Sequence, residues 1–295
     1  MTKIPVGETI RFAYAFTFGE IGTVIGLVWI PVVLNAIAAF LVERTFGGAT
    51  TDPGQGLPPG FGFFALYTVF AAFVVAMLAT AITRQALGLR QGSAFAHISV
   101  GAAELRVFGG LAGLYLLFFI FAMGVALAAV VLGVVGSALV PAKPAGEAVG
   151  AALASVGVLA GVGALIYAMV RLSFLMVASA VVEGGFGLTR SWELTRGNFW
   201  RIVAVGAATA IPVTLLVLAI NAAILGPEYI DSVVAMFRDQ AHMAKYAAIQ
   251  SQLTAAKTPL LLGVSLVLAP VTYGLAFAPA AFAYRILAGK AITPQ

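Results

Sequence analysis

SWELTRGNFWR, residues 191–201, lies between two long apolar runs and holds two of the three tryptophans in the chain. Trp192 and Trp200 belong to the residue type that favours the headgroup level of a membrane. Gly197 suits a sharp turn because glycine adopts left-handed dihedrals without steric cost, and Asn198 suits the N-cap of the helix that follows. We therefore predict an amphipathic elbow helix in the membrane interface that turns at Gly197 into a transmembrane helix. The alternative is an ordinary loop.

The composition around this motif is that of a membrane protein. Hydrophobic residues make up 62% of the 295 residues and charged residues 9%, whereas a soluble domain has about 45–50% and about 25%. A helix needs about 20 apolar residues to cross the hydrocarbon core. Six regions qualify, so we predict an all-α integral membrane protein with a single membrane domain over residues 1–295. The predicted spans cover residues 21–42, 61–82, 108–140, 149–182, 199–225 and 259–288.

The elbow motif has two weaker counterparts. Gly19, Gly109 and Gly197 each follow a stretch of mixed polarity and precede an apolar run, and they are spaced 90 and 88 residues apart. Near-equal periods are typical of internal repeats. We predict three parallel two-helix repeats, each preceded by an interfacial amphipathic elbow helix. The units cover approximately residues 1–90, 91–185 and 186–295.

The positive charges predict the orientation. With six spans, eleven of the sixteen Lys and Arg residues fall on one side and five on the other. Because Lys and Arg accumulate on the cytoplasmic side, we expect a multi-pass protein of the bacterial inner membrane with both termini in the cytoplasm. The first residues lack the shape of a cleaved signal peptide. On the opposite surface, residues 226–258 have apolar residues at helical spacing and predict one long amphipathic helix.

The sequence offers little catalytic chemistry. It contains no phosphate-binding Gly-rich loop that ends in Lys-Ser/Thr. It also contains no Gly-x-Ser-x-Gly nucleophile motif. His97 and His242 are the only histidines, and the predicted topology puts them on opposite sides of the bilayer, where they cannot share a metal. We therefore predict no enzyme activity, no catalytic residue, no cofactor and no metal. The net charge of +5 indicates membrane topology and not nucleic-acid binding.

Arginines at the predicted inner face are the candidate ligands for lipid. Arg84, Arg171 and Arg285 lie at or near the ends of spans two, four and six, where they could form a ring that holds a lipid phosphate. Arg196 and Arg201 of the elbow motif are further candidates. The alternative is that these arginines only anchor the spans on the positive side.

Four polar residues within or bordering the spans are the next candidates, because such groups are costly in hydrocarbon. Glu20 could cap span one, where the helix dipole favours an anion, or pair with an arginine. Glu183 ends the fourth span and could pair with Arg171. Asn35 and Asn221 sit inside spans one and five, where we expect hydrogen bonds between helices.

The run of residues 182–201, which begins Val182-Glu183-Gly184 and ends with the motif quoted above, resembles the signature of a bacterial membrane-domain family. That family includes the membrane part of certain glycerophosphoryl diester phosphodiesterases and stand-alone inner-membrane proteins. In its fused members, a separate soluble barrel carries the phosphodiesterase. Apolar spans occupy most of this chain, so the resemblance implies a membrane platform here without that activity.

Three functions remain open from the sequence. The first is a non-enzymatic membrane protein that binds, senses or moves a lipid or a lipid-derived amphiphile. The second is a scaffold or assembly partner for another envelope protein. The third is a secondary transporter, which the parallel repeats make less favourable, since such carriers often use inverted repeats. The oligomeric state is not predicted.

Overall fold

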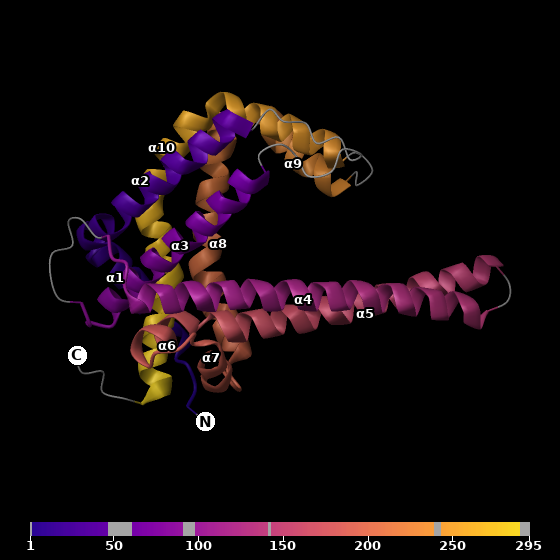
Figure 1. The fold of residues 1–295 in the computed structure, drawn as a ribbon, viewed down its shortest axis with the longest axis horizontal. Helices are drawn as coiled ribbons and strands as arrows, with labels where there is room; N and C mark the ends of the chain where they lie inside the picture. Colours follow the sequence, from indigo (N-terminus) through magenta and orange to yellow (C-terminus); the bar gives the residue numbers. More distant parts are fainter. Residues whose placement is uncertain (1, 47–60, 91–97, 141–142, 239–242, 290–295) are drawn as a thin grey trace.

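The computed structural model describes residues 2–46, 61–90, 98–140, 143–238 and 243–289, which fold as helices and connecting turns with no strand in these ranges. Within these ranges, six helices are long and apolar enough to cross a membrane, which confirms the predicted all-α class and the six candidate spans. Figure 1 labels the helices α1 (Val6–Gly19), α2 (Ile21–Phe46), α3 (Phe61–Ala86), α4 (Ala102–Leu139), α5 (Lys143–Ser173), α6 (Met176–Val182), α7 (Leu188–Leu194), α8 (Phe199–Leu225), α9 (Pro227–Arg238) and α10 (Met243–Ala288).

Helix α10 is the centre of the body, because it packs against α1, α2, α3, α8 and α9. The largest core cluster brings together Leu27 of α2, Leu78 and Ile82 of α3, and Ala278 and Ala281 of α10, all fully buried. Small alanines on α10 let its neighbours approach closely, which is how helices pack when lipid surrounds them. Figure 1 shows α7 and α9 at opposite ends of this body.

Helices α4 and α5 form a hairpin that projects sideways from the body (Figure 1). No residue in the most apolar 18-residue window of α4 is buried in the protein, and only 6% of the α5 window is. The two helices pack closely through glycines. A Cβ on Gly136 would lie 2.8 Å from the Cα of Gly150, and a Cβ on Gly150 would collide with the backbone oxygen of Gly133. We call these close contacts of Gly133, Gly136 and Gly150 the glycine seam. Beyond its base, the hairpin is held together by this seam.

The predicted turn at Gly109 is wrong, because α4 begins at Ala102 and runs through this glycine without a break. Its first turn is closed by the Glu104 carboxylate, which accepts a hydrogen bond from the Gly101 N–H at 3.1 Å. Gly109 serves close packing instead. A Cβ there would lie 2.5 Å from the ring of Phe186. The segment predicted as the middle repeat unit therefore has no separate elbow helix before α4 in its described residues.

The outer units agree with the prediction in part. Helix α7 precedes α8, and Gly197 between them has φ +76°, which confirms the turn predicted there. Helix α1 precedes α2, but Gly19 ends α1 without a positive φ, and the break falls on Glu20 with φ −110°. The predicted single helix over residues 226–258 is wrong, because α9 ends at Arg238 and α10 begins at Met243 and continues into span six.

The glycine seam of the hairpin can be tested with Gly136→Ala. The added methyl group meets backbone 2.8 Å away, so we expect the free energy of unfolding in detergent to fall by about 1–3 kcal/mol, as for other overpacked sites. Gly124→Ala is the matched control, because it lies in the same helix with nothing within 4 Å of the new Cβ. The control should be neutral or stabilised by up to about 1 kcal/mol. Equal free energies of unfolding for the two variants would contradict the role of the glycine seam in holding the hairpin together.

Candidate functional site

Polar side chains from several span ends meet on one side of the body. At the start of α2, the Glu20 carboxylate accepts a hydrogen bond from the Gln85 amide of α3 at 2.9 Å. One residue earlier in α3, Arg84 forms an ion pair at 3.7 Å with Glu104, which is buried at the start of α4. The ends of spans that the sequence assigns to the same membrane side therefore contact one another. Among the described residues, Glu20 is bound by an amide and not by an arginine.

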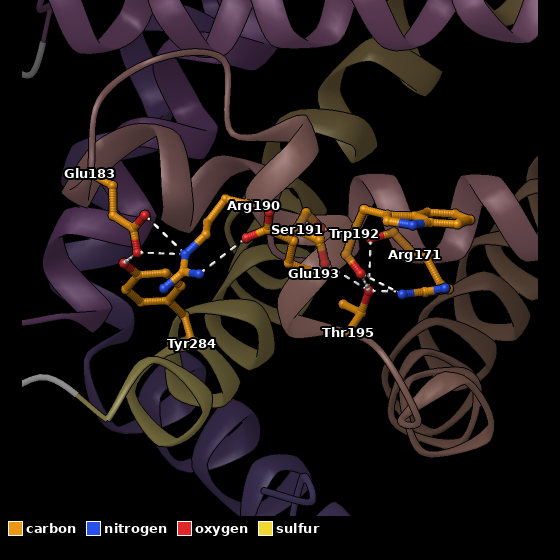
Figure 2. A network of polar contacts seen from close by, with 8 residues as sticks. All are labelled: Arg171, Glu183, Arg190, Ser191, Trp192, Glu193, Thr195 and Tyr284. Atoms are coloured by element: carbon orange, nitrogen blue, oxygen red, sulfur yellow. Dashed lines mark hydrogen bonds and ion pairs between the residues drawn. The ribbon is translucent and has the colours of Figure 1, made fainter. Parts of the chain in front are cut away.

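Arg171, near the end of α5, is held by the elbow, which we define as residues 188–198 (Figure 2). Its side chain is 5% exposed. Nε donates to the Thr195 hydroxyl at 3.3 Å, Nη1 donates to the Tyr167 hydroxyl at 3.0 Å, and Nη2 donates to the Trp192 carbonyl. The guanidinium carbon lies 3.9 Å from the centre of the Trp192 ring, a cation–π contact. We therefore assign Arg171 to holding the elbow and no longer count it among the candidate ligands for lipid.

The elbow also supplies hydrogen-bond partners for the backbone at the break between α5 and α6. Helix ends leave backbone groups without partners, and Ser191 supplies partners for two of them. Its hydroxyl donates to the Arg171 carbonyl at 2.7 Å and accepts from the Leu175 N–H at 3.1 Å. Ser191 and Thr195 are both fully buried. The short polar residues of the motif thus fix the elbow against the end of span four.

A second network joins the elbow to the last span (Figure 2). The Tyr284 hydroxyl of α10 donates to Glu183 at 2.6 Å, and Arg190 forms an ion pair with the same carboxylate at 3.0 Å. Arg190 also pairs with Glu193, three residues further along α7, at 3.2 Å. Its hydrogen bond to Glu183 raises the pKa of the Arg190 guanidinium above its ordinary value. Glu183 is therefore bound to Arg190 and Tyr284, whereas the sequence had suggested Arg171.

The start of α8 binds the beginning of the chain. Asn198 occupies the predicted N-cap position of α8, but its side chain makes no capping hydrogen bond. Its amide oxygen instead accepts from the Ile4 N–H at 3.0 Å, and its amide nitrogen donates to the Thr2 carbonyl at 3.2 Å. Arg201 donates to the Ile4 carbonyl at 2.7 Å. These partners lie more than 190 residues away in sequence.

Arg285 lines an open hollow of about 820 Å³ at the same side of the body. The carboxylate of Glu20 and the amide of Gln85 share this hollow. Arg285 is exposed, and among the described residues no ion pair or hydrogen bond engages its guanidinium. The lining comes from α1, α3 and α10, from the break between α1 and α2, and from the turn after α3. It consists of Phe12, Ala15, Phe16, Glu20, Gln85, Ala86, Leu87, Gly88, Phe282, Arg285 and Ile286.

The remaining sequence candidates do not join this site. Trp200 is 78% exposed, and Arg196 is exposed on the turn before α8. Asn35 and Asn221 are half-buried in α2 and α8. The described part of the chain offers neither of them the predicted hydrogen bond between helices, and the Asn35 side-chain oxygen has no partner there.

Within the described ranges, no group of three or more His, Asp or Glu side chains could hold a metal ion. His97 and His242, the two histidines considered from the sequence, lie outside the described residues. The chemistry available at the hollow is therefore that of one guanidinium, one carboxylate and one amide beside aromatic rings. Such a set can bind a charged ligand by hydrogen bonds and ion pairs.

Sequence reasoning missed several residues that organise the site. Gln85 follows Arg84 at the end of span two, and a polar residue at a span end is a signal that could have been used. Phe12 and Tyr284 belong to apolar runs, and nothing in their local sequence distinguishes them from ordinary packing residues. Ile4 acts through its backbone, which no side-chain pattern can reveal.

No known protein family, curated protein or solved structure matches this chain. The resemblance of residues 182–201 to the membrane domain of phosphodiesterases therefore rests on the sequence motif alone.

The role of Arg171 is tested by Arg171→Gln. Loss of the cation–π contact and of hydrogen bonds to buried oxygens should lower the free energy of unfolding by about 2–3 kcal/mol. It should also change the fluorescence of Trp192. Arg196→Gln is the matched control, because Arg196 is an exposed arginine of the same elbow, and it should leave both properties unchanged. A stable Arg171→Gln protein with unaltered fluorescence would show that the elbow is held by other contacts.

Proposed function

We propose that this chain is a non-enzymatic protein of the bacterial inner membrane that binds, senses or moves a lipid or a lipid-derived amphiphile. The binding site is the hollow beside Arg285. The single observation that carries this proposal is a guanidinium without a partner in the described chain, facing an open hollow at the level where candidate spans begin and end.

The position of the hollow favours a headgroup. Span one begins beside Glu20, while spans two and six end beside Gln85 and Arg285. Residues at the ends of spans lie at the headgroup level of a bilayer. A planar guanidinium there suits phosphate, and basic pockets between spans are typical lipid headgroup sites. Arg84 is paired with Glu104 and Arg171 is buried by the elbow, so Arg285 is the inner-face arginine best suited to a ligand.

The apolar lining favours an amphiphile over a free ion. Phe12, Phe16 and Phe282 come from α1 and α10 and border the same hollow as the polar groups. A volume of about 820 Å³ falls in the range of about 300–1,000 Å³ found for small-molecule sites. Aromatic and charged lining in one hollow matches a ligand with a polar head and an apolar stem.

The contacts between span ends support the predicted topology. In the proposed orientation, the hollow, α7 and both termini face the cytoplasm, and α9 faces the opposite compartment. The elbow then lies in the interface with Trp200 toward the headgroups. Helices α1 and α7 precede spans one and five in equivalent positions, which favours related outer repeat units around a modified middle unit.

The hairpin of α4 and α5 favours a second candidate, a membrane scaffold for another envelope protein. Its apolar surface beyond the base has no neighbour in the described chain except the partner helix of the hairpin. Exposed side chains such as Tyr115, Leu127 and Leu159 could contact lipid tails or the spans of a second protein. Large exposed apolar surfaces are typical of both situations.

The proposal is tested by Arg285→Ala and native mass spectrometry of the full chain released from nanodiscs. We expect the wild-type protein to retain phospholipid and the variant to retain at least about threefold less, since a partly exposed ion pair contributes up to about 1 kcal/mol. Arg11→Ala is the matched control, because Arg11 is exposed on α1 and does not line the hollow.

The same spectra separate the two candidate functions. Retention of lipid that depends on Arg285 and not on Arg11 supports a lipid site. A wild-type protein that carries no lipid but copurifies from native membranes with a stoichiometric protein partner would contradict lipid binding and favour the scaffold.

A further inference from the structure

We propose that the hollow takes a zwitterionic headgroup that joins a phosphate to a primary ammonium, with the phosphate at Arg285 and the ammonium at Glu20. This inference rests on the proposed function and goes further by naming the chemical class of the ligand. It follows from how the two charges are arranged and from what surrounds them.

Opposite charges are kept apart in one hollow. Arg285 and Glu20 both line it, yet no ion pair joins them within the described residues. Two opposite unit charges attract over several ångströms, and the attraction grows as water is displaced. A dipolar ligand placed between them satisfies both groups at once, whereas a simple anion satisfies Arg285 and is repelled by Glu20.

The carboxylate of Glu20 is oriented for a donor. Its Oε2 accepts the hydrogen bond from the Gln85 amide at 2.9 Å, and Gln85 lines the same hollow. Among the described residues, Oε1 receives no hydrogen bond, and no arginine or lysine pairs with this carboxylate. An ammonium carries three donors, so it can use Oε1 without displacing Gln85.

Aromatic rings add a surface suited to the cationic end. The rings of Phe12 and Phe282 stack with centres 4.8 Å apart, and Phe16 lies next to Phe12 at 6.1 Å. All three line the hollow. Aromatic faces attract a cation by about 0.5–1 kcal/mol at exposed sites, and they also cover the apolar part of an amphiphile. The lining therefore favours a lipid with an amine over one that carries only an anionic phosphate.

The test compares two lipids with the same acyl chains on the full chain. Nanodiscs with equal amounts of phosphatidylethanolamine and phosphatidylglycerol present the same phosphate with and without the ammonium. We expect the wild-type protein to retain phosphatidylethanolamine about threefold to fivefold over phosphatidylglycerol, the preference that one partly exposed charge pair supplies. Glu20→Gln should bring this ratio close to one while phospholipid is still retained. The matched control is Glu8→Gln, because Glu8 is an exposed carboxylate of α1 outside the hollow. This variant should keep the wild-type ratio.

The outcomes are distinct. A wild-type ratio of one, or a preference that persists in Glu20→Gln, overturns the zwitterion while leaving the lipid site intact. If Glu20→Gln fails to fold, the ratio of the two lipids retained by the wild-type protein still tests the zwitterionic site. Retention of neither lipid contradicts the proposed function itself.

A further arm adds free phosphoethanolamine. Displacement of bound lipid by the free compound at equal concentration supports the zwitterionic site and assigns it to a soluble ligand, and no displacement assigns it to the membrane lipid.

Discussion

Hydrocarbon offers no partner to a charge or a free hydrogen-bonding group, and this constraint organises the whole molecule. Charged residues at several span ends therefore meet on one side of the body, where they are paired or enclosed by protein. Arg84 pairs with buried Glu104, and Arg171 is surrounded by Tyr167 and the elbow. The apolar helices between these ends need only pack through small residues, as the alanines of α10 and the glycine seam of the hairpin do.

The elbow connects parts of the chain that are far apart in sequence. Through Asn198 it binds the first residues, and through Arg190 and Glu183 it reaches Tyr284 near the end of α10. Tyr284 is fully buried and hydrogen-bonded, and its neighbour Arg285 lines the hollow. The helix turn that carries Arg285, the charge that we propose to bind the ligand, is thus anchored through the neighbouring Tyr284. Such support keeps a binding group in place before the ligand arrives.

Much of the architecture could be predicted because it depends on local composition. Apolar length gives the six candidate spans, and the glycine at 197 gives the turn before α8. Tertiary contacts could not be predicted. Gly109 was expected to turn the chain, but its lack of a side chain makes room for the ring of Phe186. Asn198 was expected to cap α8, but the Ile4 backbone outcompetes the helix end for its side chain. Among the predicted inner arginines, only packing distinguishes buried Arg171 from exposed Arg285.

We propose that the span ends bearing the elbow and the hollow lie together on one side of the membrane. The chain has no cysteine, so single cysteines can be placed at Lys3, Arg196 and Asp231, which are all exposed. In oriented vesicles, a membrane-impermeant maleimide should label Lys3→Cys and Arg196→Cys from the cytoplasmic side only and Asp231→Cys of α9 from the other side only. Labelling of Arg196→Cys and Asp231→Cys from the same side would contradict this arrangement.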